Sequence, residues 1–155
     1  MTLETVLLAV GPGDADRSTK LAETVVEVAK PADATVVLGH VFTDSEYDEV
    51  LSQLEFDTEL EGVDPDEVAT RHSTIRELRD VLDEHEIEYE TRGAVGDHGP
   101  TIVELATEED ADRVVVGGRR RSPTGKAVFG STAQEVLLSA PCPVTFVRND
   151  EDDEA

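Results

Sequence analysis

The sequence predicts an α/β protein, built as a doubly wound, five-stranded parallel sheet with helices on both faces. Short apolar segments rich in Val and Leu alternate along the 155 residues with longer segments whose apolar residues recur at helical spacing. Most of the apolar segments are continuous, as is typical of strands buried on both faces of a parallel sheet. Right-handed crossovers between such strands place helices on both sides of the sheet.

Five segments are expected to form the strands. The first of them ends in Gly-Pro-Gly, which predicts that the chain leaves the strand into a loop. Another, IEYETRG, alternates polar and apolar residues. In chain order, the expected strands are residues 3–10, 34–42, 87–93, 113–117 and 143–148.

Four helices are expected between the strands, over residues 16–30, 65–85, 100–109 and 131–139. Asp14 or Asp16 is expected to cap the first helix, since a carboxylate accepts from free backbone N–H groups there. Asp64 caps the second helix, with Pro65 at its first position. Residues 43–63 are acidic and weakly patterned, which predicts a long loop with at most one helical turn.

The composition is strongly acidic, with 36 Asp and Glu against 13 Lys and Arg and a formal net charge of −23. Such a surface repels nucleic acids and anionic membranes, so neither is an expected partner. A disordered acidic chain would lack the regular apolar periodicity seen here. The even spread of carboxylates therefore favours a folded protein adapted to high salt, from a halophilic source.

Other features of the chain predict a soluble cytoplasmic protein. Cys142 is the single cysteine, so no internal disulfide can form. No basic segment followed by an apolar run opens the sequence, and no stretch approaches about 18 apolar residues. We expect one domain over residues 1–148 and a flexible acidic tail over 149–155.

The stretch GGRRRSPTGKAVFGST, residues 117–132, follows the fourth expected strand and holds four of the 13 Lys and Arg residues. Its glycines allow backbone to approach a ligand, and the helix starting near Ser131 offers free N–H groups to an anion. Charge-assisted hydrogen bonds to phosphate are available from Arg119, Arg120, Arg121 and Lys126. A plain strand-to-helix turn with solvated arginines is the alternative.

Two familiar phosphate loops do not fit the sequence. A Walker A loop needs Gly where Arg120 stands and Ser or Thr where Ala127 stands. A dinucleotide fingerprint starting at Gly11 would need a third glycine at Asp16, and Pro12 stiffens its turn.

The histidines give no pattern of a metal or catalytic site. His40 ends a buried strand and is expected to be packed and hydrogen-bonded, whereas His72 and His85 are expected on the surface of an acidic helix. Asp97 and His98 lie in a loop at the edge where ligands bind in such sheets, so they are weaker candidates for ligand contact. No zinc-ligand spacing and no nucleophile motif is present.

The segment ADRVVVGGRRRSPTGKAVFGSTAQEVLLSAPCPVTFVR, residues 111–148, resembles the C-terminal half of universal stress proteins of the UspA type. Their signature is G-x2-G-x9-G-[ST] followed by a helix and APCPV. Gly117 and Gly130-Ser131 match it, whereas Arg120 replaces the second glycine. Upstream, LLAVGPGDAD is similar to the family's first strand, LGHVF to its second strand and AVGDHG to the turn after its third strand, so the resemblance spans residues 3–148.

The resemblance implies a fold like that of the adenine nucleotide alpha hydrolases and a site for ATP, with or without Mg²⁺. Gly11 stands where ATP-binding members usually have Asp at the end of the first strand. The site residues implied by the resemblance and the loop are Ala9 and Val10 beside the adenine, Gly11 at the end of the first strand, Val41 after the second strand, and Gly117, Arg119, Arg120, Lys126, Gly130, Ser131 and Thr132 toward the phosphates.

The leading functional hypothesis is a dimeric stress-response module that binds ATP or a related adenine nucleotide. The alternative is a dimeric scaffold that has lost nucleotide binding and acts through protein partners. Rapid catalysis is not expected, since a Walker lysine context and an identifiable base are both missing, which leaves slow ATP hydrolysis at most. As in the family, the last strand, 143–148, is expected to form the homodimer by pairing with its copy.

We expect the melting temperature to climb as potassium chloride is raised to molar concentration. The Debye length falls from about 10 Å at 0.1 M to about 3 Å at 1 M salt, so repulsion among the 36 carboxylates is screened. A thermal scan by circular dichroism across this range measures the effect. A flat or falling curve would contradict the interpretation of the acidic surface as an adaptation to salt.

Overall fold

The computed structural model describes residues 3–11, 14, 17–53, 65–118 and 131–148, and all structural statements below concern these residues. Residues 119–130, which include the four clustered cations, and the acidic tail, residues 149–155, lie outside them. In chain order the elements are β1 (Thr5–Val10), α1 (Ser18–Ala32), β2 (Thr35–Phe42), α2 (Asp44–Gln53), α3 (Pro65–Arg71), α4 (Ser73–Glu84), β3 (Tyr89–Val95), α5 (His98–Glu108), β4 (Arg113–Gly118), α6 (Ser131–Ser139) and β5 (Val144–Arg148).

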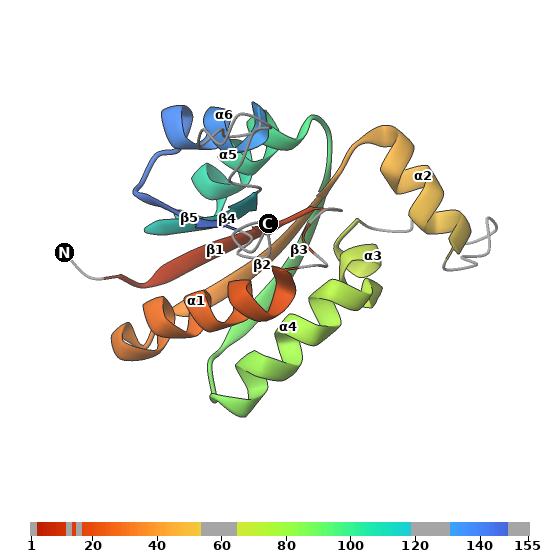
Figure 1. The fold of residues 1–155 in the computed structure, drawn as a ribbon. Coiled ribbons are helices and arrows are strands. Elements are labelled where there is room, and N and C mark those ends of the chain that lie inside the picture. Colours follow the sequence, from red (N-terminus) through yellow and green to blue (C-terminus); the bar gives the residue numbers. More distant parts are fainter. Residues whose placement is uncertain (1–2, 12–13, 15–16, 54–64, 119–130, 149–155) are drawn as a thin grey trace, which may run out of the picture.

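The predicted doubly wound parallel sheet is confirmed. Its five strands lie in the order β3-β2-β1-β4-β5, and every neighbouring pair is parallel. Helices α1 and α4 cover one face of the sheet, and α5 and α6 cover the other (Figure 1). The chain winds outward from β1 in one direction through β2 and β3, and then in the other through β4 and β5, so the winding reverses beside β1.

Two hydrophobic clusters, one on each face, hold the helices to the sheet. One side of β1 contributes Val6, Leu8 and Val10 to the cluster beneath α1 and α4, and its other side contributes Leu7 and Ala9 to the cluster beneath α5 and α6. All five of these side chains are at most 4% exposed. The continuous apolar run of β1 thus follows from its position between two layers of helices.

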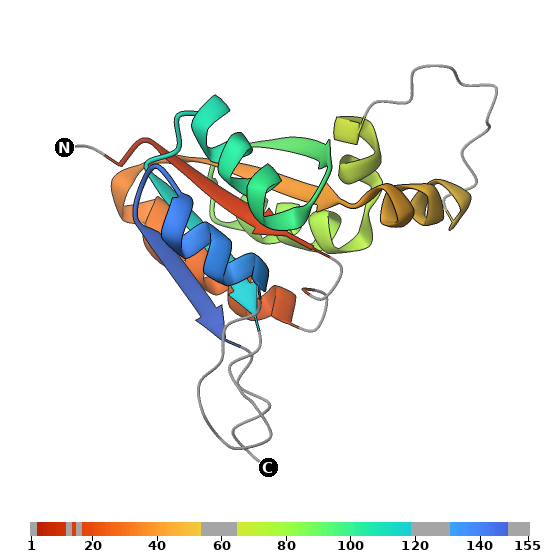
Figure 2. The same ribbon diagram turned by 90° about the horizontal axis from the view of Figure 1, so that it is seen from above.

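Helix α2 replaces the loop expected over the start of residues 43–63. It projects away from the sheet beyond the end of β2 (Figure 2). Thr43 and Glu46 form a capping box, because the Thr43 N–H donates to Glu46 Oε1 at 2.9 Å and the Glu46 N–H donates to Thr43 Oγ1 at 3.2 Å. The T-x-x-E spacing is a helix signal that the weak apolar pattern of this segment obscured.

The helix expected over residues 65–85 is divided into α3 and α4. His72 separates them with an extended backbone, and its Nδ1 accepts from the Thr74 N–H at 3.3 Å as the N-cap of α4. The local cap therefore interrupts a sequence whose apolar spacing continues through the break. Elsewhere the shifts are small: β3 extends to Val95, and α5 begins at His98 rather than Pro100.

The expected cap of α1 by Asp14 is wrong, and Asp16, the other candidate, lies outside the described residues. The helix begins at Ser18, and its N-cap is Arg17, whose side chain makes no capping hydrogen bond. Asp14 bonds instead to the loop that leaves β1, where its Oδ2 accepts from the Gly11 N–H at 2.7 Å. The carboxylate thus closes the preceding turn rather than the helix.

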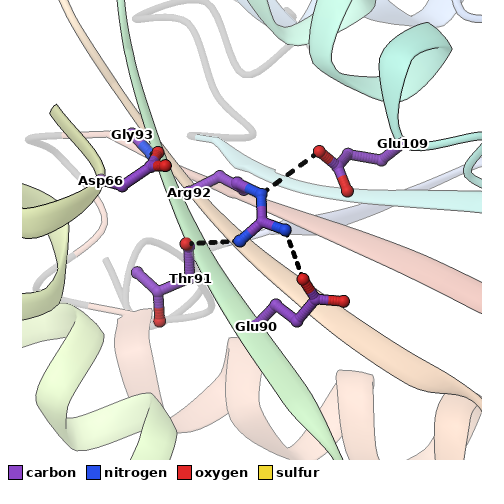
Figure 3. A network of polar contacts seen from close by, with 6 residues as sticks. All are labelled: Asp66, Glu90, Thr91, Arg92, Gly93 and Glu109. Carbon is purple, nitrogen blue, oxygen red and sulfur yellow. Dashed lines mark hydrogen bonds and ion pairs between the residues drawn. The ribbon is translucent and has the colours of Figure 1, made fainter. Parts of the chain in front are cut away.

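Helix α3 packs directly against the edge strand β3. The Gly93 N–H donates to Asp66 Oδ1 at 2.6 Å, and a Cβ added at Gly93 would lie 2.0 Å from the Pro65 carbonyl oxygen. On the same strand Arg92 forms ion pairs with Glu90 and, at 3.4 Å, with Glu109 after α5 (Figure 3). This edge of the sheet is therefore covered.

Gly93→Ala should lower the free energy of unfolding by about 1–3 kcal/mol, because the added methyl group must push α3 away from β3. The matched control is Gly11→Ala, whose Cβ would meet nothing closer than Asp14 Oδ2 at 3.9 Å, so its stability should change by less than about 1 kcal/mol. Urea unfolding in molar potassium chloride measures both. Equal stability of the two variants would show that α3 is not held as described.

Candidate functional site

A cavity of about 250 Å³ opens at the carboxyl ends of β1 and β4, where the winding of the sheet reverses. We call it the crevice. Ligands in open α/β sheets bind at this kind of place, because the loops after the two strands separate there. The residues that line it are Ala9, Val10, Gly11, Asp14, Arg17, Val41, His98, Ile102, Val116, Gly117, Thr132 and Ala133.

The fold brings together six of the residues predicted for the site. The six that line the crevice are Ala9, Val10, Gly11, Val41, Gly117 and Thr132. Ser131 begins α6 beside them. The other four, Arg119, Arg120, Lys126 and Gly130, lie outside the described residues.

The crevice has an apolar part and a polar part. Val41, Ile102 and Val116 are each at most 5% exposed and present aliphatic side chains to its interior. The polar part holds Asp14, Arg17, His98 and Thr132, from three helix starts and the loop after β1. A ligand with one flat apolar end and one polar end matches this division.

Asp14 and Arg17 form a buried ion pair in the polar part of the crevice. The Asp14 side chain is 9% exposed and the Arg17 side chain 7%, and Arg17 Nη1 donates to Asp14 Oδ1. The Asp14 N–H also donates to the Gly11 carbonyl oxygen at 3.1 Å, which closes the turn after β1. The pair is thereby fixed to the backbone at the end of the central strand.

Burial raises the pKa of Asp14 above its ordinary value of 3.8. The hydrogen bond from Gly11, the attraction of Arg17 and that of His98 act in the opposite direction and do not cancel the loss of hydration. The pair is therefore an electrostatically costly feature of the crevice.

Gly117 is needed at the end of β4 for this pair to fit. A Cβ added there would lie 2.7 Å from Arg17 Cδ and 3.0 Å from Asp14 Oδ1. Neither Asp14 nor Arg17 was predicted as a site residue. The D-x-x-R spacing, which puts an acid and a base three residues apart, was the available signal.

His98 reaches the crevice from the start of α5, not from a loop as expected. Its Nε2 lies 2.8 Å from Glu46 Oε1, so a carboxylate on α2 fixes the imidazole at the mouth of the crevice. Glu46 is the residue that also caps α2. The contact therefore joins α2 to the rim of the crevice.

His40 is packed, as expected, but its predicted hydrogen bond is absent. It is 1% exposed, and neither ring nitrogen has a hydrogen-bond partner among the described residues. The ring stacks on Phe42 with centroids 4.1 Å apart and lies 4.4 Å from the ring of His72. His72 was expected on the surface, and this contact shows that the expectation is wrong. Its ring faces inward because the chain breaks between α3 and α4 at this residue.

Burial lowers the pKa of His40 to about 3, and repulsion from His72 and His98 acts in the same direction. An opposing influence of the Val41 backbone is the smallest of the four and does not reach hydrogen-bond geometry. His40 is thus a neutral core residue at neutral pH.

No metal centre is formed by the described residues, which contain no group of three or more His, Cys, Asp or Glu side chains suitably placed. None of the helices in that part of the chain is both long enough and apolar enough to cross a membrane.

The strand order and the crevice at its reversal place the protein among the doubly wound α/β proteins with a site at the carboxyl edge of the sheet. The sequence pattern of the universal stress protein family matches residues 2–148. The chain belongs to this family.

Comparison with individual proteins agrees with the assignment. The chain is 35% identical over 85 residues to a universal stress protein of Mycolicibacterium smegmatis, a match that covers 52% of this chain and 65% of that protein. It is 43% identical over 47 residues to one of Thermus aquaticus, covering 30% and 34%. The matched segments thus span from about a third to just under two thirds of these relatives.

Solved structures show the same fold over nearly the whole chain. A universal stress protein from Archaeoglobus fulgidus has a TM-score of 0.69 and 27% identity, covering 94% of this chain and 98% of that one. Another from Archaeoglobus fulgidus, in complex with dAMP, gives 0.66 and 21%, covering 96% and 100%. A family protein from Arabidopsis thaliana with AMP bound gives 0.64 and 16%, covering 96% and 94%. Structural relatives thus bind adenine nucleotides.

Acidification should destabilise the protein through His40. The folded pKa of about 3 lies below the ordinary value of 6.5, so the unfolded chain takes up the proton first as the pH falls. The stabilising effect of keeping His40 neutral is complete above pH 6.5 and is lost progressively toward pH 3. At pH 5 the loss amounts to about 2 kcal/mol, at about 1.4 kcal/mol per pH unit.

His40→Phe should remove this part of the pH dependence, because phenylalanine fills the site without titrating. The free energy of unfolding is measured by urea at pH 7.5 and pH 5 for the wild type, for His40→Phe and for the control His85→Gln, whose side chain is partly exposed. The control should follow the wild type. An unchanged difference between the two pH values in His40→Phe would refute the role of His40.

Proposed function

We propose that the protein binds an adenine nucleotide in the crevice and acts as a dimeric, cytoplasmic stress-response module. The observation that carries the proposal is the assembly, at the reversal point of the sheet, of six residues that the family resemblance assigned to the nucleotide. The nucleotide complexes of structural relatives support the same ligand class.

The two parts of the crevice give the ligand an orientation. Adenine fits the apolar part, beside Ala9, Val41 and Val116, where its flat ring displaces water from aliphatic surface. The phosphates then point toward Thr132 in the first turn of α6, where the free N–H groups and the helix dipole favour an anion. In this proposal Gly130 and Ser131 complete the start of that site.

ATP, with or without Mg²⁺ on its phosphates, is the ligand we propose within this class. Its longer phosphate chain carries more negative charge than that of AMP, and in this proposal Arg119, Arg120 and Lys126 bind it. Charge-assisted hydrogen bonds from these side chains would explain why an acidic chain gathers cations there. Rapid hydrolysis is not part of the proposal.

ATP at 100 times its dissociation constant should stabilise the fold by about 2.7 kcal/mol. For a domain of this size the melting temperature then rises by about 5–11 °C. Adenosine should give a smaller rise because it lacks the phosphates. Gly130→Val should abolish the shift by blocking backbone approach, and the double variant Arg119→Ala/Lys126→Ala should reduce it.

The matched control is Lys30→Ala/Arg92→Ala, which removes the same charge from residues that do not line the crevice. It should leave the nucleotide-induced shift unchanged. Differential scanning fluorimetry and titration calorimetry measure the effect. If ATP, ADP and AMP all leave the melting temperature unmoved and release no heat, the scaffold that lacks nucleotide takes the place of this proposal.

The proposed homodimer forms through β5. This strand pairs with β4 on one side and, among the described residues, has no neighbour on its other side. Leu138 on α6, the helix that leads into β5, is 77% exposed, and Leu137 is 38% exposed. An edge strand of this kind favours pairing with another strand, and exposed leucines on the preceding helix are apolar surface that a partner would cover.

Val144→Lys and Phe146→Lys should each shift the protein toward monomer, because an added charge would be buried in the strand pair. Thr19→Lys, on the exposed side of α1, is the control and should leave the oligomeric state unchanged. Light scattering after gel filtration in molar potassium chloride measures the mass. A stable monomer of the native protein would contradict the proposal.

A further inference from the structure

The Asp14–Arg17 pair is the feature of the crevice that the proposed function leaves without a role. Two contacts of the carboxylate are accounted for, the Gly11 N–H on Oδ2 and Arg17 Nη1 on Oδ1. A carboxylate has room for about four hydrogen bonds, so Asp14 retains capacity to accept. Arg17 retains capacity to donate, because its buried Nε has no partner among the described residues.

The pair is not needed to fill the core. Replacing a buried ion pair by apolar side chains of similar size is often neutral or stabilising. Here the two side chains also force glycine at position 117, because Arg17 and Asp14 occupy the space of a side chain there. The pair thus limits the sequence of a second strand while lining the crevice, which points to a ligand.

Charge decides which part of a ligand fits the pair. A phosphate would meet the carboxylate of Asp14 as closely as the guanidinium of Arg17, so attraction and repulsion nearly cancel. A hydroxyl group has no charge, and it both donates and accepts. Two adjacent hydroxyls therefore match a fixed acceptor beside a fixed donor.

The position of the pair in the crevice also suits the sugar of a nucleotide. Asp14 is bonded to Gly11 at the end of β1, and Arg17 lies on Gly117 in β4. Both glycines line the crevice, as do the aliphatic residues proposed for adenine and Thr132 at the start of α6. In a nucleotide the sugar joins the base to the phosphate.

We propose that Asp14 and Arg17 bind the 2′- and 3′-hydroxyls of ribose and so make the crevice selective for ribonucleotides over 2′-deoxyribonucleotides. The inference rests on the proposed nucleotide function. It assigns the pair to the sugar and not to the phosphates, which are bound elsewhere in the crevice.

The test compares the affinities for AMP, dAMP and adenosine by titration calorimetry in molar potassium chloride. The wild type should bind AMP about tenfold more tightly than dAMP, the typical effect of one hydrogen bond to a charged group. In the double variant Asp14→Asn/Arg17→Met, which has no net charge change, this ratio should fall to about one. The ratio of AMP to adenosine should stay as in the wild type.

Two further variants distinguish loss of ribose binding from a general disturbance of the fold. Arg92→Met, outside the crevice, should keep the wild-type ratio of AMP to dAMP. Asp14→Asn alone retains the shape of the side chain and should lower the ratio in the same direction as the double variant. Circular dichroism checks the fold of each, and the wild-type ratio tests the inference even if the double variant does not fold.

The outcomes separate this inference from the proposed function. If the wild type binds AMP and dAMP equally well, or the folded double variant keeps the wild-type preference, the pair does not bind the sugar while nucleotide binding stands. If the double variant loses affinity for AMP and dAMP alike but not for adenosine, the pair binds phosphate and the inference is wrong. If the wild type binds no nucleotide, the proposed function itself fails.

Discussion

The structure depends on the burial of β1 between two layers of helices. Parallel neighbours on both edges and helices on both faces bury the apolar side chains of this strand, which alternate between two cores. Because the chain winds outward from β1 in both directions, the helices that follow β1 and β4, α1 and α6, diverge to opposite faces of the sheet. The crevice is a consequence of that divergence.

The side chains around the crevice follow the same division. Those that face the apolar layer beneath α5 and α6 line one part of it, whereas the turn after β1 supplies the Asp14–Arg17 pair. The pair stays in place because Gly117 gives it room and the Gly11 backbone gives it a hydrogen bond. The central strand therefore positions both the apolar and the polar part of the site.

Membership of the universal stress protein family accounts for the fold over nearly the whole chain, and departures from the family pattern distinguish this protein. Gly11 stands where ATP-binding members usually carry a carboxylate. In this protein the carboxylate of Asp14 lies in the same turn, where it accepts a hydrogen bond from the Gly11 N–H. The sequence holds 36 Asp and Glu residues, whereas the cores beneath the helices are built from apolar side chains. We expect salt to screen the repulsion among these carboxylates.

The sequence by itself determined the strands and the parallel sheet, because continuous apolar runs report burial on both faces. The six residues predicted for the nucleotide that line the crevice came from the family resemblance together with the loop after the fourth strand. The start of α2 could also have been predicted, since the T-x-x-E spacing at Thr43 is typical of a capping box. Only the tertiary structure decided that Asp14 turns to Arg17 instead of capping α1, and that His72 turns inward onto His40. The first of these orientations depends on the space that Gly117 leaves in another strand, and the second depends on the break between α3 and α4. Neither can be predicted from apolar periodicity, which reports only on residues within one helix or strand.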